Sequence, residues 1–229
     1  MLLFLVEKQR QKSSIRSFKL LKFKFFKSII LILLFYSIST HLRAQELILV
    51  VGGSGLTGWE TIKEAINQKY KVRATTTDLN RAREKFGESG FSWVKVDVRI
   101  MDDIRKAMND VDYVISTIGG SCYDPGGPTS SRHIDYQGVV NLAGIAKDYG
   151  IKHFVLTSSI NAGIAEVKLN EFCDNVHMWK WLGEDYIRDS GITYTIVRPG
   201  GLGQGDGGKN DIIIKGSREL KTGFIERAD

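Results

Sequence analysis

Three glycines, Gly52, Gly55 and Gly58, recur at every third position directly after the apolar run of residues 47–51. The first glycine permits a tight turn, the second lets a pyrophosphate approach the backbone, and the third lets a helix pack on the preceding strand. The helical pattern of residues 59–68 would place free N–H groups and the positive end of a helix dipole at the phosphates. The spacing therefore predicts a dinucleotide site, and a purely structural turn is the alternative.

Residues that could bind the adenosine end of such a ligand follow the second and third apolar segments. Thr77 and Asp78 lie about 20 residues after the glycines, where an acid favours the 2′-hydroxyl of NAD and a base favours the 2′-phosphate of NADP. Arg81 and Arg83 follow, so the signals conflict, and a solvated helix face explains both arginines equally well. Asp97 is placed to accept a hydrogen bond from the adenine amino group.

The segments that must position these residues alternate between strand-like and helix-like patterns, and the loops between them are short. This alternation predicts a single α/β domain with a doubly wound parallel sheet, whose ligands bind beyond the carboxyl ends of the strands. The loop at 121–131 is rich in Gly, Pro and Ser, and we expect it to be flexible and to cover the site. Residues 202–209 have no regular period, and two further short strands are expected at 211–215 and 223–226. The expected strands of the main sheet are 47–51, 70–76, 91–96, 111–117, 152–157 and 192–197, and the helices are 59–68, 80–86, 102–108, 134–149 and 178–190.

The net charge of +6 is concentrated at the N-terminus. Residues 1–44 hold nine basic residues and one acid, which gives them +8 and leaves −2 for residues 45–229. The globular part is therefore not a basic nucleic-acid-binding domain. The four histidines and two cysteines lack metal-ligand spacing, so no metal is expected. We expect Cys122 and Cys173 to be buried thiols, with a disulfide as the alternative if the chain is exported.

The first 44 residues have the order of a targeting segment. A basic stretch at 19–27 precedes the uncharged apolar run 28–38, and Ala44 is a small residue at a possible cleavage point. The run is short for a membrane span, so a cleaved signal peptide is the first interpretation, and the protein would then be exported. An uncleaved anchor that contacts a membrane through 28–38 is the second. A misassigned start codon, which would leave the protein cytoplasmic, is the third.

With these segments placed, the chain resembles the short-chain dehydrogenase/reductase superfamily, and within it the atypical, NmrA-like NAD(P)-binding branch. The matching segments run in the family's order across residues 46–229. They are Val51 to Gly58, Asp97-Val98-Arg99, Val114 to Gly119, Asp135 to Gly138, Phe154 to Ser159, Trp179-Lys180 with Gly183-Glu184, and Tyr194 to Gly201.

The resemblance implies roles for individual residues. Ser159, at the end of the fifth strand, matches the catalytic serine, with Ser158 beside it, and Lys180 matches the lysine of the family's Tyr-x-x-x-Lys pair. The cofactor is NADP or NAD, and the resemblance slightly favours NADP. The residue patterns and the resemblance together give a candidate cofactor site of Gly52, Gly55, Leu56, Thr57, Gly58, Thr77, Asp78, Arg81, Asp97, Val98, Thr117, Ile118, Gly119, Lys180 and Pro199.

The sequence departs from the family at the residue that donates a proton. Val176 stands four residues before Lys180, where the tyrosine is expected. His177 and Tyr123 are possible substitute acids, although His177 at a helix start is expected to be a solvated histidine. The family's last segment, beyond Asp229, is missing, which suggests a fragment.

Three functions remain open. The first is an NAD(P)-dependent oxidoreductase that acts on an unknown small carbonyl compound. The second is a non-catalytic NAD(P)-binding sensor or scaffold, which Val176 favours. The third is a degenerate copy without cofactor affinity.

Overall fold

A computed structural model describes residues 45–209, 211–216, 219 and 222–229. The expected leader, residues 1–44, lies outside the described residues. In the described part of the chain, no helix is both long enough and apolar enough to span a membrane.

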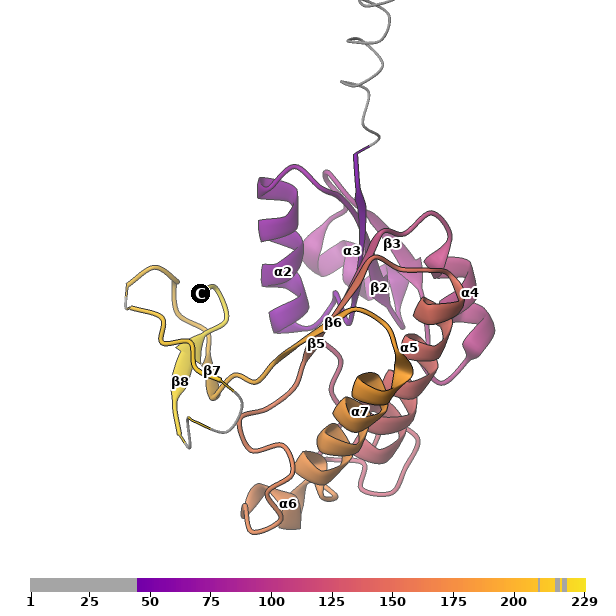
Figure 1. Cartoon of the computed structure of the whole chain (residues 1–229). Helices are drawn as coiled ribbons and strands as arrows, with labels where there is room; N and C mark the ends of the chain where they lie inside the picture. Colours follow the sequence, from indigo (N-terminus) through magenta and orange to yellow (C-terminus); the bar gives the residue numbers. More distant parts are fainter. Residues whose placement is uncertain (1–44, 210, 217–218, 220–221) are drawn as a thin grey trace, which may run out of the picture. The chain divides into compact units, whose positions relative to one another are not determined.

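A six-stranded parallel sheet forms the centre of the domain, in the order β3-β2-β1-β4-β5-β6 (Figure 1). The strand order reverses beside β1, which pairs with β2 on one edge and with β4 on the other. The doubly wound parallel sheet expected from the sequence is confirmed. Its strands are β1 (Leu47–Val51), β2 (Lys71–Thr76), β3 (Ser92–Lys95), β4 (Tyr113–Ser116), β5 (His153–Thr157) and β6 (Tyr194–Val197).

Helices cover both faces of this sheet, and each face has its own apolar cluster (Figure 1). On one face Ile62 and Ala82 pack with Trp93, and on the other Ile104, Leu142 and Ile187 belong to the larger cluster. Helices α2 (Leu56–Asn67) and α3 (Leu79–Phe86) cover the first face; α4 (Met101–Met108), α5 (Val139–Asp148) and α7 (Val176–Ser190) cover the second.

The helix expected at 134–149 is helical but not uniform. Its first part is a π-helix, η1 (Arg132–Gly138), which continues directly into α5. The helix expected at 178–190 begins two residues earlier, at Val176. A short helix, α6 (Leu169–Phe172), was not predicted, because four residues are too few to display a helical period.

The C-terminal residues form a separate two-stranded parallel ribbon of β7 (Gly201–Gly203) and β8 (Phe224–Glu226). The expected strand at 223–226 is therefore confirmed, whereas the one at 211–215 is wrong. Residues 211–216 have no regular structure, and Ile212, Ile213 and Ile214 are exposed. The lack of period in 202–209 concealed β7, because three residues with two glycines carry no alternation.

Candidate dinucleotide site

The glycine turn after β1 has the close backbone approaches that the spacing predicts. Gly52 has a φ of +83°, in the left-handed region that favours glycine. A Cβ on Gly58 would lie 2.2 Å from the carbonyl oxygen of Gly52, which no real side chain tolerates. The N–H of Gly55 donates to that same carbonyl at 2.9 Å. The turn is therefore held tightly against the start of α2.

Neighbouring strands fix the turn from both sides. The N–H of Gly52 donates to Oγ1 of Thr75 on β2 at 3.1 Å, and Oγ1 of Thr117, beyond β4, donates to the carbonyl of Val51 at 3.0 Å. Gly53 was not predicted as a site residue, but it is also constrained, because a Cβ there would lie 2.9 Å from the Cβ of Ala74. The presence of a fourth glycine within the motif could have indicated this.

A cavity of about 340 Å³ opens along the carboxyl ends of the central strands. It combines the glycine turn, the ends of β2 and β3, and the turn after β4. Eight of the predicted cofactor residues line it: Gly52, Gly55, Thr77, Asp97, Val98, Thr117, Ile118 and Gly119. The remaining ones do not: Leu56, Thr57, Gly58, Asp78, Arg81, Lys180 and Pro199. The loop at 121–131 contributes Ser121 and Thr129 to the lining.

Two predicted acids at the adenosine end already have partners. Asp97 accepts from Arg99 Nε at 2.8 Å, and this hydrogen bond holds the pKa of the carboxyl below its usual value against the effect of burial. Oδ1 of Asp78 accepts from the N–H of Arg81 at 3.1 Å and so caps α3. The side chain of Arg81 is exposed.

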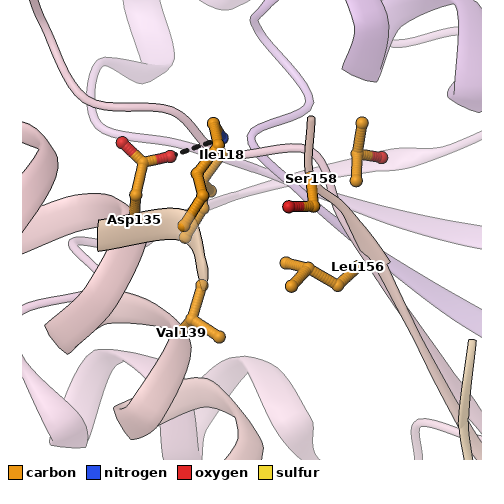
Figure 2. A pocket seen from close by; sticks show the side chains of 7 residues that line it. Ile118, Asp135, Val139, Leu156 and Ser158 are labelled. Carbon is orange, nitrogen blue, oxygen red and sulfur yellow. Dashed lines mark hydrogen bonds and ion pairs between the residues drawn. The ribbon is translucent and has the colours of Figure 1, made fainter. Parts of the chain in front are cut away.

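Lys180 lies in a second, smaller pocket that shares Ile118 with the large cavity. Its Nζ forms an ion pair with Oδ1 of Asp135 at 2.6 Å, and the two side chains are 17% and 1% exposed. Oδ2 of Asp135 accepts from the N–H of Gly120 at 2.8 Å. Figure 2 shows Asp135 on one side of this pocket and Ser158 on the other. Asp135 therefore joins helix α7 to the turn that follows β4.

The structure distinguishes the two serines that follow β5. Ser158 is buried and lines the pocket with Lys180, whereas Ser159 does not line it. Oγ of Ser159 accepts from the N–H of Asn161 at 3.2 Å. The carbonyl of Pro199 accepts from the N–H of Ile160, directly after Ser159, at 2.9 Å. Pro199 therefore anchors the chain that follows the two serines.

Asp135 and Glu184 are buried charged residues to which the sequence interpretation gave no role, although both lie in the segments that resemble the family. Glu184 has no exposed side-chain surface and pairs with Arg188 and Arg198. Burial opposes its ionisation, but hydrogen bonds from Arg198 and Arg188 and the charge of Arg198 outweigh burial and lower its pKa. This network fixes α7, and with it Lys180, against the end of β6.

The expectation that His177 is solvated is wrong. His177 is 4% exposed, and Asn170 contacts both its backbone N–H and its Nδ1 at 3.0 Å. Burial, and then the charge of Lys180, lower the pKa of the imidazole. A histidine that is neutral near pH 7 is a poor proton donor, which weakens its case as the substitute acid.

The expectation of two free thiols is also wrong, because Cys122 and Cys173 form a disulfide across 51 residues. It joins the loop after β4 to the segment between α6 and α7. Sequence spacing could not have indicated this pair, since only the fold brings the two segments together. Among the described residues, no group of three or more His, Cys, Asp or Glu side chains could hold a metal ion.

Comparison with known proteins supports a domain that binds a nicotinamide dinucleotide. The sequence pattern of the NAD(P)H-binding family matches residues 52–229. Protein TIC 62 of Pisum sativum is 32% identical over 182 residues, which cover 71% of this chain and 34% of that protein. Sanguinarine reductase of Eschscholzia californica is 36% identical over 102 residues, 43% of this chain and 37% of that enzyme. The chain thus spans about a third of the length of such relatives.

Solved structures show the same fold. A putative NAD-dependent epimerase/dehydratase from Bacillus halodurans aligns with a TM-score of 0.65 at 24% identity over 80% of this chain and 83% of that one. The reductase ChuY of Escherichia coli O157:H7 aligns with a TM-score of 0.63 at 22% identity over 80% and 85%. Because the family pattern matches residues 52–229, the chain belongs to the NAD(P)H-binding family.

Proposed function

We propose that this protein transfers hydride from a reduced nicotinamide dinucleotide to a small carbonyl compound. The observation that carries the proposal is that the large cavity and the Lys180 pocket are neighbours, with Ile118 lining both. A dinucleotide with its pyrophosphate at the glycine turn would reach from the adenosine end, at Thr77 and Asp97, toward Lys180. The cofactor supplies the hydride, and the protein supplies binding and orientation.

The residues around the smaller pocket would orient the nicotinamide end. The ammonium group of Lys180, held by Asp135, is positioned to donate hydrogen bonds to ribose hydroxyls. The hydroxyl of Ser158 lies in the same pocket and is better placed than Ser159 to contact a substrate oxygen. Because Val176 cannot donate a proton, water would protonate the alkoxide that hydride transfer forms, and hydroxide would leave to the solvent.

NADPH is the proposed cofactor, in line with the family resemblance. Asp78 caps α3, so its carboxylate is engaged, and Arg81 is exposed one turn into that helix, where it could reach a 2′-phosphate. Arg81→Ala is expected to weaken NADPH binding several-fold and to leave NADH binding unchanged. Equal effects on both cofactors would contradict the assignment.

The test of the main proposal is turnover by the full-length chain. NADPH and NADH oxidation are followed at 340 nm with a panel of aldehydes, ketones and quinones, and Ser158→Ala is compared with Ser159→Ala as its matched control. We expect activity with some panel members and a larger loss for Ser158→Ala. Cofactor binding without any turnover would refute the proposal.

A non-catalytic NAD(P)-binding sensor or scaffold is the second candidate. The buried Val176 at the position of the family's tyrosine favours it. If the protein is a sensor or scaffold, the Val176→Tyr variant should have no activity. If it is an enzyme that lacks only the proton-donating tyrosine, the same variant should turn over faster than the wild type.

We also propose that residues 1–44 are a targeting leader. Their basic-then-apolar order, the described disulfide, and the chloroplastic relatives support it. Sequencing of the mature N-terminus and cell fractionation test this, and an intact Met1 on a cytoplasmic protein would exclude it.

A further inference from the structure

Arg227, in the C-terminal ribbon, reaches the beginning of the helix that follows the glycine turn. Its Nε donates to Oγ1 of Thr57, in the first turn of α2, at 3.2 Å. Its Nη1 donates to the carbonyls of Leu202 and Gly203 at 2.9 and 2.7 Å. The guanidinium group is therefore held in one orientation between the ribbon and the helix N-terminus.

At this contact the described residues bring two positive groups together. The positive end of the α2 dipole faces the glycine turn, and the first turn of α2 contains no acidic residue. A guanidinium group beside a helix N-terminus is electrostatically unfavourable. No described carboxylate forms an ion pair with Arg227, and no described residue accepts a hydrogen bond from its Nη2. An anion between the two positive groups would resolve this arrangement.

We propose that Arg227 is a phosphate-binding residue that holds the cofactor's pyrophosphate against the glycine turn from the ribbon side. The inference rests on the proposed function, because it places a further residue in the same dinucleotide site. A guanidinium group with a free edge suits phosphate oxygens, and its bonds to two carbonyls pre-organise it. The ribbon is thus part of the cofactor site and not an appendage of the sheet.

The test separates phosphate binding from mere support of the fold. Affinities for ADP-ribose and for adenosine, which lacks phosphate, are measured calorimetrically on the full-length chain and on Arg227→Gln. We expect about a tenfold loss for ADP-ribose, the scale of a charge-assisted hydrogen bond, and no change for adenosine. The ADP-ribose affinity of the wild type should also fall more steeply with added salt than that of the variant.

Two further variants make the result specific. Lys209→Gln removes a cation from the same segment, where Lys209 pairs with Asp206, and should change neither affinity. Arg227→Lys keeps the positive charge but not the planar guanidinium group, and it should give an intermediate loss of ADP-ribose affinity. This variant replaces Arg227→Gln in the test if Arg227→Gln does not fold. Equal losses for both ligands, or none, would overturn the proposal. A wild type that binds no dinucleotide would instead refute the proposed function itself.

Discussion

The two ends of the candidate site are built by different means. At the glycine turn, backbone groups make the contacts, and the important residues are those that have no side chain, such as Gly52 and Gly58. At the other end, buried charged side chains, Asp135 with Lys180 and Glu184 with two arginines, set the geometry. The first end therefore depends on space and the second on charge balance.

This difference predicts how each end responds to substitution. A Cβ at Gly58 would lie 2.2 Å from the carbonyl oxygen of Gly52, so the glycine turn tolerates little change. At the other end Asp135 holds Lys180, so the valine at position 176 leaves this ion pair intact.

The largest effect is expected from a charge placed at the glycine turn. Gly55→Asp would set a carboxylate at the proposed pyrophosphate site, and the repulsion should cost about 4 kcal/mol, about a thousandfold in the Kd of NADPH. The fluorescence of NADPH reports the binding.

Gly55→Ala is the matched control for this variant. Gly55 has a φ of −81°, which alanine adopts readily, and the new Cβ would meet only the Gly52 carbonyl at 3.2 Å. We expect about a tenfold loss of affinity, because the Cβ takes space that the pyrophosphate needs at the backbone, and this loss is far smaller than that of Gly55→Asp. A similar loss in both variants would mean that the added charge has no effect of its own.

At the charged end, Lys180→Met should destabilise the fold, because it leaves Asp135 buried without its counter-ion. The expected loss is about 3 kcal/mol in the free energy of unfolding, measured by urea denaturation. Adding Asp135→Asn should restore much of it, since the amide oxygen can still accept from Gly120. If the double variant loses as much stability as the two single variants together, the Asp135–Lys180 ion pair does not couple the two residues.

Removing the disulfide tests whether the loop after β4 belongs to the charged end. The Cys122→Ser/Cys173→Ser variant should lose about 2 kcal/mol of stability, because the unfolded chain gains freedom. The Kd of NADPH should rise by a few-fold at most, because Ser121 beside the bridge lines the cavity but the glycine turn is remote from it in sequence. Dithiothreitol should lower the urea midpoint of the wild type and leave the variant unchanged. If dithiothreitol changes the urea midpoint of neither protein, the disulfide does not stabilise the fold.

The smallest effect concerns pH. Burial lowers the pKa of His177 in the folded state, so below the usual value of about 6.5 the unfolded chain binds more protons. Stability therefore falls as the pH drops below 6.5, by about 1 kcal/mol or less between pH 7 and pH 5. His177→Gln should flatten this part of the stability curve. Parallel curves for the variant and the wild type would contradict the lowered pKa.

The sequence predicted the sheet and the glycine turn because both are local. Runs such as residues 47–51 and the spacing of Gly52, Gly55 and Gly58 carry their own signal within a dozen residues. The Cys122–Cys173 bridge and the Asp135–Lys180 pair join residues 51 and 45 positions apart, so neither is visible before the fold is known. The burial of His177 depends in the same way on its packing beside Asn170.

The π-helix at Arg132–Gly138 has a consequence for the numbering of the family. A π-turn holds one residue more than an α-turn, so it is equivalent to an insertion inside a helix. Asp135 lies in this segment and Val139, four residues later, begins α5, and both line the Lys180 pocket. A residue inserted or deleted between them would change the side of the helix on which Asp135 lies, while α5 keeps its own packing. The placement of gaps between 135 and 139 therefore decides whether an alignment compares equivalent residues.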